Sequence, residues 1–283
     1  MSDVDDLTLG EVLEVVERLY PPATAQSWDR VGLVTGDLRQ PVRRIHLAVD
    51  PTLAVIEEAR ALGADLLLTH HPLLLRGVHA VATTTAKGAS VTNLVVGDVA
   101  LYVAHTNADV AADGVCEALA RACGLTTTAP LTLVEDQPLG RVGDLEFAVG
   151  LRAFVERLAT RLPAAAGGIR VAGPPDAEVR RVAVLGGAGD DLFDAVRAGG
   201  ADVYVTADLR HHPALEAREE ARGGPPYLVD AGLWASEQVW LAVAERALRA
   251  GLGERATRVE THISTVRTDP WTFVVGADPG GMP

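Results

Sequence analysis

Apolar residues near the beginning of the chain recur at the three- and four-residue spacing of one face of an α-helix. They are Leu9, Val12, Leu13, Val16 and Leu19. Thr8 and Glu11 stand three residues apart at the start of this stretch, where each can cap the other's backbone amide, and Pro21 stops the pattern. The pattern therefore predicts an amphipathic helix over residues 9–19.

Beyond residue 40 the pattern changes to short apolar runs that alternate with segments of helical periodicity. Strands are predicted at 44–49, 65–69, 101–104, 181–185, 202–206 and 227–230, and helices at 53–62, 84–96, 114–122, 191–198 and 236–249. Strands and helices that alternate at these lengths indicate right-handed βαβ crossovers. The expected fold class is therefore α/β, with mostly parallel sheets.

One local sequence occurs twice. The residues GADLLLT at 63–69 return as GADVYVT at 200–206, and each copy follows a predicted strand and helix of similar length. This indicates two related βαβ units, although chance similarity between two buried strands is an alternative. We expect one α/β domain at 1–125 and a second at 126–257. A strand within 258–276 is expected to return to the first sheet, and the tail at 277–283 is expected to be disordered.

Composition narrows the class of protein. The chain is 48% apolar over 283 residues, which is enough for a buried core, and its net charge of −13 disfavours binding to nucleic acid or anionic membranes. No apolar run approaches the ~18 residues of a membrane span, and the N-terminus has no signal-peptide pattern. Cys116 and Cys123 are expected to be apolar core residues rather than a disulfide or a metal pair. The expected location is the reducing cytoplasm.

Candidate chemistry gathers after the predicted strands. Five of the eight histidines stand there: His70, His71, His105, His211 and His212. Asp109 and Glu237 follow the strands at 101–104 and 227–230. Loops at the carboxyl ends of parallel strands converge, so these side chains are candidates for one site. Neutral imidazoles with carboxylates suit zinc, manganese, iron or cobalt, and the sequence therefore predicts a metal centre.

Each candidate has a simpler alternative. The His-His-Pro turn can place one ring on a backbone carbonyl and the other in solvent, and Asp109 can be the N-cap of the helix at 114–122. Glu237 can simply favour the positive end of a helix dipole. Trp28 and Asp29 are expected in a loop at the mouth of a site, and the alternative is a buried Trp28 whose indole N–H finds a backbone partner. The glycine-rich stretch 186–189 is interpreted as tight-turn packing rather than a phosphate loop.

Six short motifs follow one another along nearly the whole chain. They are WDRVGL at 28–33, THHPL at 69–73, HTNAD at 105–109, TAD at 206–208, DAG at 230–232 followed by SE at 236–237, and TDPW at 268–271. In this order they resemble the Nif-three-like family, also known as GTP cyclohydrolase I type 2 homologues or dinuclear-metal hexameric proteins. The resemblance implies two related three-layer α/β domains, a ring-shaped homohexamer and a two-metal site that faces its internal cavity.

The resemblance also implies a ligand set. His70 would bind one ion, His71 and Asp109 the other, and Glu237 would bridge both. The family has a further histidine ligand four residues before the bridging glutamate, where this chain has Leu233. One ion should therefore bind well while the second site lacks a ligand. His105, His211 or His212 are the candidates that could replace it.

Two functions follow from these expectations. The first is a metal-dependent hydrolase that acts on a small, nucleotide-like substrate, with His105 as a proton shuttle because an unperturbed imidazole has a pKa of about 6.5. The second is a non-catalytic metal-handling protein or hexameric scaffold. The missing ligand at Leu233 favours the second function somewhat, because two-ion chemistry needs both ions and binding does not.

Overall fold

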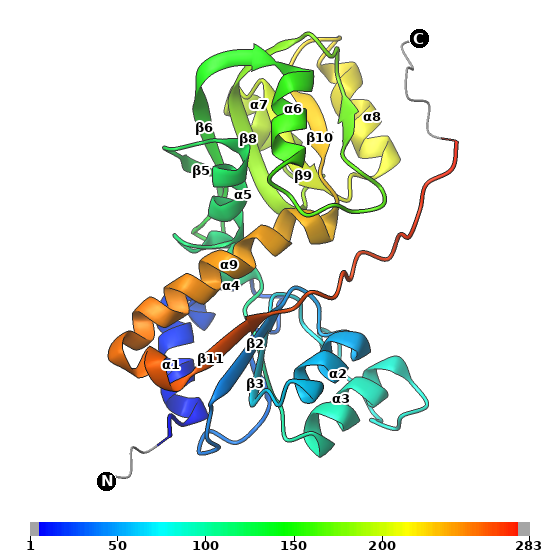
Figure 1. Ribbon diagram of the computed structural model, residues 1–283. Coiled ribbons are helices and arrows are strands. Elements are labelled where there is room, and N and C mark those ends of the chain that lie inside the picture. The colour runs from blue at the N-terminus through cyan, green and yellow to red at the C-terminus, as the bar shows by residue number, and fades with distance from the viewer. Residues whose placement is uncertain (1–5, 277–283) are drawn as a thin grey trace. The chain divides into compact units, whose positions relative to one another are not determined.

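The computed structural model describes residues 6–276 and has an α/β fold with two sheets, which confirms the predicted fold class (Figure 1). The described chain divides into two compact units. The first contains residues 6–118, 133–139 and 240–268, and the second contains 119–132, 140–239 and 269–276. The tail at 277–283, for which we expected disorder, lies outside the described residues.

The first unit has a five-stranded sheet in the order β1-β4-β3-β2-β11. Its strands are β1 (Gly32–Thr35), β2 (Arg44–Ala48), β3 (Leu66–Thr69), β4 (Ala100–Val103) and β11 (Glu260–Ile263). Strands β4, β3, β2 and β11 run parallel, and β1 pairs antiparallel with β4 at the edge. Every residue of β3 and β4 is buried, as is typical of central strands covered on both faces.

Helices cover this first sheet. They are α1 (Leu9–Leu19), α2 (Leu53–Ala61), α3 (Ala86–Val96), α4 (Thr106–Val110), the first part of α5 (Val115–Cys123) and the last part of α9 (Leu233–Leu252), with 3-10 turns η1 (Pro22–Thr24) and η2 (Gly253–Arg258). The predicted capping box of α1 is confirmed. The side chain of Thr8 accepts a hydrogen bond from the backbone amide of Glu11, and the side chain of Glu11 accepts one from the backbone amide of Thr8. Val55 of α2 and Leu94 of α3 join the core on one face of the sheet.

Strand β11 is shorter than the strand predicted at 258–276. Regular pairing ends at Ile263, and residues 264–276 have no helix or strand. The amide of Ser264 still donates to the carbonyl of Leu47 on β2, but the amide of Thr265 donates to the carboxylate of Glu58 on α2 instead of to a strand. The hydroxyls of Ser264 and Thr265 donate to the same carboxylate. No helix within residues 6–276 combines the length and the apolar content needed to cross a membrane.

The second unit has a six-stranded sheet in the order β5-β6-β8-β9-β10-β7. Its strands are β5 (Ala129–Val134), β6 (Gln137–Gly150), β7 (Arg170–Ala172), β8 (Glu178–Ala188), β9 (Val203–Ala207) and β10 (Tyr227–Asp230). Only the centre, β8-β9-β10, is parallel, and β6 and β7 run antiparallel on either side of it. The second sheet is therefore mixed, because the segment 126–176 supplies three strands.

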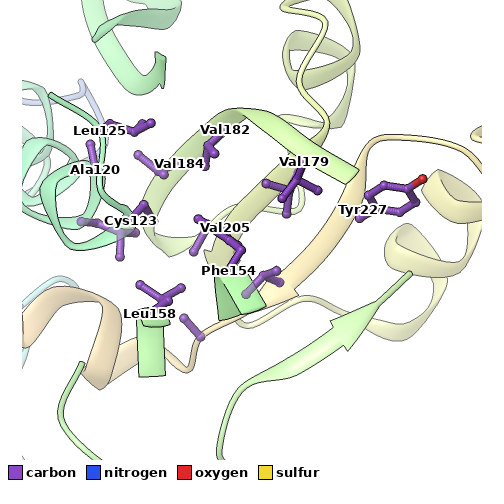
Figure 2. Close-up of a cluster of buried hydrophobic side chains, with 14 of the residues drawn as sticks. Ala120, Cys123, Leu125, Phe154, Leu158, Val179, Val182, Val184, Val205 and Tyr227 are labelled. Atoms are coloured by element: carbon purple, nitrogen blue, oxygen red, sulfur yellow. The ribbon is translucent and has the colours of Figure 1, made fainter. Parts of the chain in front are cut away.

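Helices α6 (Leu151–Ala159), α7 (Phe193–Ala198) and α8 (His211–Glu220) belong to the second unit. Figure 2 shows its core, in which Phe154 and Leu158 of α6 lie with the valines of β8 and β9. Cys123 is buried in the same cluster, and burial raises the pKa of its thiol. Cys116 is also buried, so both cysteines are core residues, as expected.

Candidate metal centre

The site begins at the carboxyl end of β3 in the first unit. Pairing continues one step beyond the strand, since the amides of His70 and His71 donate to the carbonyls of Ala48 and Val49 at 3.2 and 2.9 Å. These bonds fix both residues beside the end of β2. The two rings lie 4.9 Å apart, with His70 fully buried and His71 half-buried. Past the end of the strand, the two neighbouring rings therefore lie side by side.

His105 reaches the same place from the neighbouring strand. It follows β4 and precedes α4, and its ring centroid lies 5.1 Å from that of His70 and 5.5 Å from that of His71. One ring nitrogen of each histidine lies within 4.8 Å of those of the other two, so the three could hold one metal ion. This is the group of metal-capable side chains that the described residues bring together.

Hydrogen bonds hold all three rings by the same nitrogen. The Nδ1 atom of His70 lies 2.9 Å from the carbonyl of Ala104, that of His71 lies 2.7 Å from Asp50 and that of His105 lies 3.0 Å from Asp29. A carbonyl or an ionised carboxylate can only accept a hydrogen bond, which places the proton of each neutral ring on Nδ1. The lone pair is then on Nε2. Histidines that bind metals are typically oriented in this way.

Asp109 lies beside this group. Its Oδ1 atom is 3.6 Å from Nε2 of His70, and the residue is buried. Two ligands at about 2.1 Å from a tetrahedral ion lie about 3.4 Å from each other, so the separation fits a shared ion. Asp109 lies within α4 rather than at the start of α5, and the alternative that it caps the helix at 114–122 is therefore wrong.

Asp29 is a site residue whose role was not identified from the sequence. Its Oδ1 accepts from His105, and its Oδ2 accepts from the backbone amide and hydroxyl of Thr106 at 3.0 and 2.6 Å. Burial alone would raise the pKa of this carboxyl, but the hydrogen bonds from His105 and Thr106 outweigh it and hold the pKa below its usual range. Asp29 therefore fixes both the His105 ring and the start of α4.

Trp28 lies next to His105, with ring centroids 5.9 Å apart in an edge-on arrangement. Half of its surface is exposed, and its indole N–H donates to the side chain of Gln26. The alternative of a buried tryptophan with a backbone partner is therefore wrong. The position beside a candidate ligand fits the expectation of a residue at the mouth of the site.

Asp50, which follows β2, is a site residue that the sequence analysis did not single out. One oxygen accepts from His71, and the other accepts from the hydroxyl of Thr268 in the segment after β11. The available signal was the position of an acidic residue directly after a predicted strand. Through Asp50, the segment that carries the TDPW motif supports the orientation of a candidate ligand.

The remaining predicted residues lie in the second unit. Glu237 is buried in α9, and its Oε1 is 2.7 Å from the point where a side chain at Gly187 would begin. Gly187, with φ of +80°, therefore makes room for Glu237 and confirms a packing role for this glycine. Leu233 is the first residue of α9. The ligand role of Glu237 stays a prediction.

His211 and His212 do not join the three-histidine group. Both stand in the first turn of α8, where they are exposed, and their rings contact each other at 5.1 Å. Of the three histidines that we considered as replacements for the missing ligand, His105 is the one that the structure places with His70 and His71.

Known proteins that are similar to this chain identify its family. Residues 7–270 match the profile of the family described as Duf34/NIF3 (NGG1p interacting factor 3). A Streptomyces coelicolor protein named "GTP cyclohydrolase 1 type 2 homolog" is 48% identical over 276 residues, which cover 96% of each chain. A relative of the same name from Mycobacterium leprae is 34% identical over 374 aligned positions, which cover 94% of this chain and 95% of that protein, so it contains segments that this chain lacks.

The fold has been seen before. A Bacillus cereus protein described as related to NIF3 superposes with a TM-score of 0.86 at 25% identity, over 95% of this chain and all of that chain. The family match spans nearly the whole described chain and includes every residue of the metal-capable group. This chain therefore belongs to the Duf34/NIF3 family.

Proposed function

We propose that this protein is a divalent-metal-dependent hydrolase that acts on a nucleotide-like substrate. The observation that carries the proposal is the convergence of three histidines, each held through Nδ1, beside the Asp109 carboxylate. Nitrogen and oxygen donors of this kind suit zinc, manganese, iron or cobalt.

The ligand assignment departs in two respects from the sequence-based expectation. We place His70, His71 and Asp109 on one ion rather than on two. We assign His105 as a ligand rather than as a proton shuttle, because its Nδ1 is held by Asp29 and its ring lies with those of His70 and His71. It is the third nitrogen ligand of that single ion, and a second ion still lacks the ligand for which this chain has Leu233. Asp109 completes the set in the first unit, and Glu237 is included on the strength of the family resemblance.

The ion and the protein would have different roles. A divalent ion would act as a Lewis acid that activates water and polarises a carbonyl or phosphoryl group. Asp29 and Asp50 hold the imidazoles in orientation, so the ligands need not reorganise during a reaction. Trp240 contacts the ring of His70 at 5.5 Å and keeps water from that side, and the half-exposed Trp28 borders the His105 side.

The substrate class comes from the relatives. Their name, "GTP cyclohydrolase 1 type 2 homolog", refers to a reaction on a purine nucleotide. We therefore propose a nucleotide or a molecule of similar size and charge as the substrate. We also propose a cytoplasmic homohexamer, as the family resemblance implies.

One observation favours a second candidate, a non-catalytic metal-handling protein. Leu233 is an apolar residue at the position where the family has a ligand, and metal storage or transfer needs one ion where dinuclear catalysis needs two. The two functions differ in a measurable way, because only the hydrolase turns over a nucleotide.

The first experiment measures metal per chain by elemental analysis, in protein purified without added metal or chelator. We expect about one ion in the wild type, a loss of most of it in His71→Ala, and no change in His79→Ala, whose side chain is exposed. Leu233→His should raise the content towards two. Equal metal content in wild type and His71→Ala would refute the metal centre.

The second experiment measures hydrolysis of GTP, GDP and ATP by the metal-loaded protein, beside Glu237→Gln. Turnover that requires the metal and is lost in Glu237→Gln supports the hydrolase. Metal that binds stoichiometrically and passes to an acceptor without turnover of any of these nucleotides would instead establish the metal-handling function.

A further inference from the structure

The second unit has a cavity of its own, between α8 and the strands β10 and β7. Its volume is about 330 Å³, within the range of small-ligand sites. Leu228 of β10 and Ala172 of β7, which are paired in the sheet, line it from one side. Leu228 is two residues before Asp230, and Ala172 is two residues after Arg170. Asp230 and Arg170 form the next pair of residues that faces the same side of the sheet.

Helix α8 lines the other side of this cavity. His211, Ala214, Leu215 and Arg218 follow the spacing of a single helix face, and all four line the cavity. The middle of the face is apolar and its two ends are polar. The cavity therefore offers an apolar surface for the body of a ligand, with basic groups at both ends.

Arg218 is the basic group that matters most. Its Nη1 donates to the carbonyls of Gly224 and Pro226 at 2.7 and 2.6 Å, and its guanidinium lies 5.2 Å from the centre of the Tyr227 ring. Within residues 6–276 it forms no ion pair with a carboxylate. The side chain is half-buried, and burial lowers its pKa. A positive charge in this position is only partly compensated, because its acceptors are neutral.

The acidic group of the cavity is already engaged. Asp230 accepts from the guanidinium of Arg170 at 2.5 Å and from the backbone amides of Leu209 and Gly232 at 3.1 Å each. The carboxylate of Asp230 thus neutralises Arg170 and leaves the charge of Arg218 unmatched. The lining as a whole is net positive in a chain whose net charge is −13.

We propose that this cavity binds a small organic anion, with its apolar body against Leu215 and Leu228 and one carboxylate paired with Arg218. The unmatched positive charge of Arg218 favours an anion. The apolar lining favours an apolar group such as a phenyl ring or a branched alkyl chain. Strand β7, at three residues, is too short an edge to pair with a bound peptide, which favours a small molecule.

The test uses the full-length protein and two probes, 3-phenylpropionate and its uncharged analogue 3-phenylpropionamide. Titration calorimetry, or saturation-transfer NMR, should give saturable binding of the acid and about tenfold weaker binding of the amide. Equal affinity for the two probes, or no saturable binding of the acid at millimolar concentration, would overturn the proposal. Tighter binding of an apolar pentapeptide than of the acid would overturn it in favour of a peptide ligand.

Two variants and a control locate the binding. Arg218→Met should lower the affinity for the acid about tenfold and leave the affinity for the amide unchanged. Arg152→Met, at an exposed arginine on α6 of the same unit, should change neither affinity. Because Arg218 also supports the 224–226 loop, Ala214→Leu provides an independent test that fills the cavity without touching that loop. Ala214→Leu should lower the affinity for both probes. Unchanged affinity in a folded Ala214→Leu protein would show that the ligand binds elsewhere.

Discussion

Asp65 and Asp202 make the same pair of hydrogen bonds in the two units. Each uses Oδ2 to accept hydrogen bonds from two consecutive backbone amides in the first half of the neighbouring parallel strand or directly before it, at 2.7 to 2.9 Å. The donors are Arg43 and Arg44 for Asp65, and Arg180 and Arg181 for Asp202. In both copies a glycine two residues earlier has φ of +65°, a conformation that few other residues adopt. The repeated sequence therefore reflects a repeated structure, and chance similarity does not explain it.

The two copies diverge directly after the repeated strand. Thr69 is followed by His70 and His71, whereas Thr206 is followed by Ala207 and Asp208. Among the described residues, the same local scaffold thus carries the three-histidine group, which could hold a metal ion, in the first unit. The second unit places an arginine-lined cavity beside its own strands.

The first prediction concerns these two aspartates. Asp65→Ala and Asp202→Ala should each lower the free energy of unfolding by about 1–3 kcal/mol, because two backbone amides lose a charged acceptor. Urea unfolding monitored by circular dichroism measures the effect, with Glu57→Ala, at an exposed glutamate on α2, as the control. A loss in one variant and none in the other would show that the two positions are not energetically equivalent.

Much of the first unit could be predicted from the sequence because its signals are local. The strands β3 and β4 are buried apolar runs, and the capping box of α1 lies within four residues. The histidines at the strand ends were predicted for the same reason. Parallel strands bring their carboxyl ends together, so position along the chain is enough to indicate a shared site.

The partners of those histidines could not be predicted in the same way. Asp29 reaches His105 across 76 residues and Asp50 reaches His71 across 21, and no local pattern specifies such contacts. For a related reason, the strands β5 and β7 of the second sheet, and the first part of β6, were not predicted. The segment 126–176 is rich in proline and glycine, and its strands are defined by pairing with β8 and β10 rather than by their own periodicity.

The second prediction concerns Asp29. Asp29→Asn keeps the shape of the side chain but removes the charged acceptor of His105, and we expect the affinity for zinc to fall about 10–100-fold. Competition with a chromophoric chelator measures the affinity. Asp37→Asn, at an exposed aspartate, should leave it unchanged. If both variants bind zinc as the wild type does, the hydrogen bond from His105 does not support the metal centre.

The third prediction concerns the space that Gly187 leaves for Glu237. Gly187→Ala places a methyl group 2.7 Å from Oε1 of Glu237 at a residue with positive φ, so the free energy of unfolding should fall by about 1–3 kcal/mol. Gly167→Ala is the matched control, since its added methyl group meets no atom within 4 Å and its φ is not positive. Equal chemical-denaturation midpoints for the two variants would contradict the close packing of Glu237.

The fourth prediction concerns acid stability through His46. This residue is fully buried in β2, 2.9 Å from Glu58 and stacked on His262, and burial lowers its pKa although Glu58 acts in the opposite direction. The unfolded chain, with a histidine pKa of about 6.5, therefore binds the proton more strongly than the folded chain does. The free energy of unfolding should therefore be independent of His46 protonation above that pH and should fall as the pH drops below it.

Urea unfolding of the chelator-treated protein at a series of pH values between 7.5 and 5 measures this dependence, and removing metal first separates it from ligand protonation. His46→Leu should show a shallower fall than the wild type, because no buried imidazole is then protonated on unfolding. His79→Gln, at an exposed histidine, should keep the wild-type slope. A wild-type slope in His46→Leu would show that His46 is not the source of the acid sensitivity in this range. Glu58 would not be the source either, because hydrogen bonds from Ser264 and His46 lower the pKa of its carboxyl in spite of burial, so it takes up a proton only at lower pH.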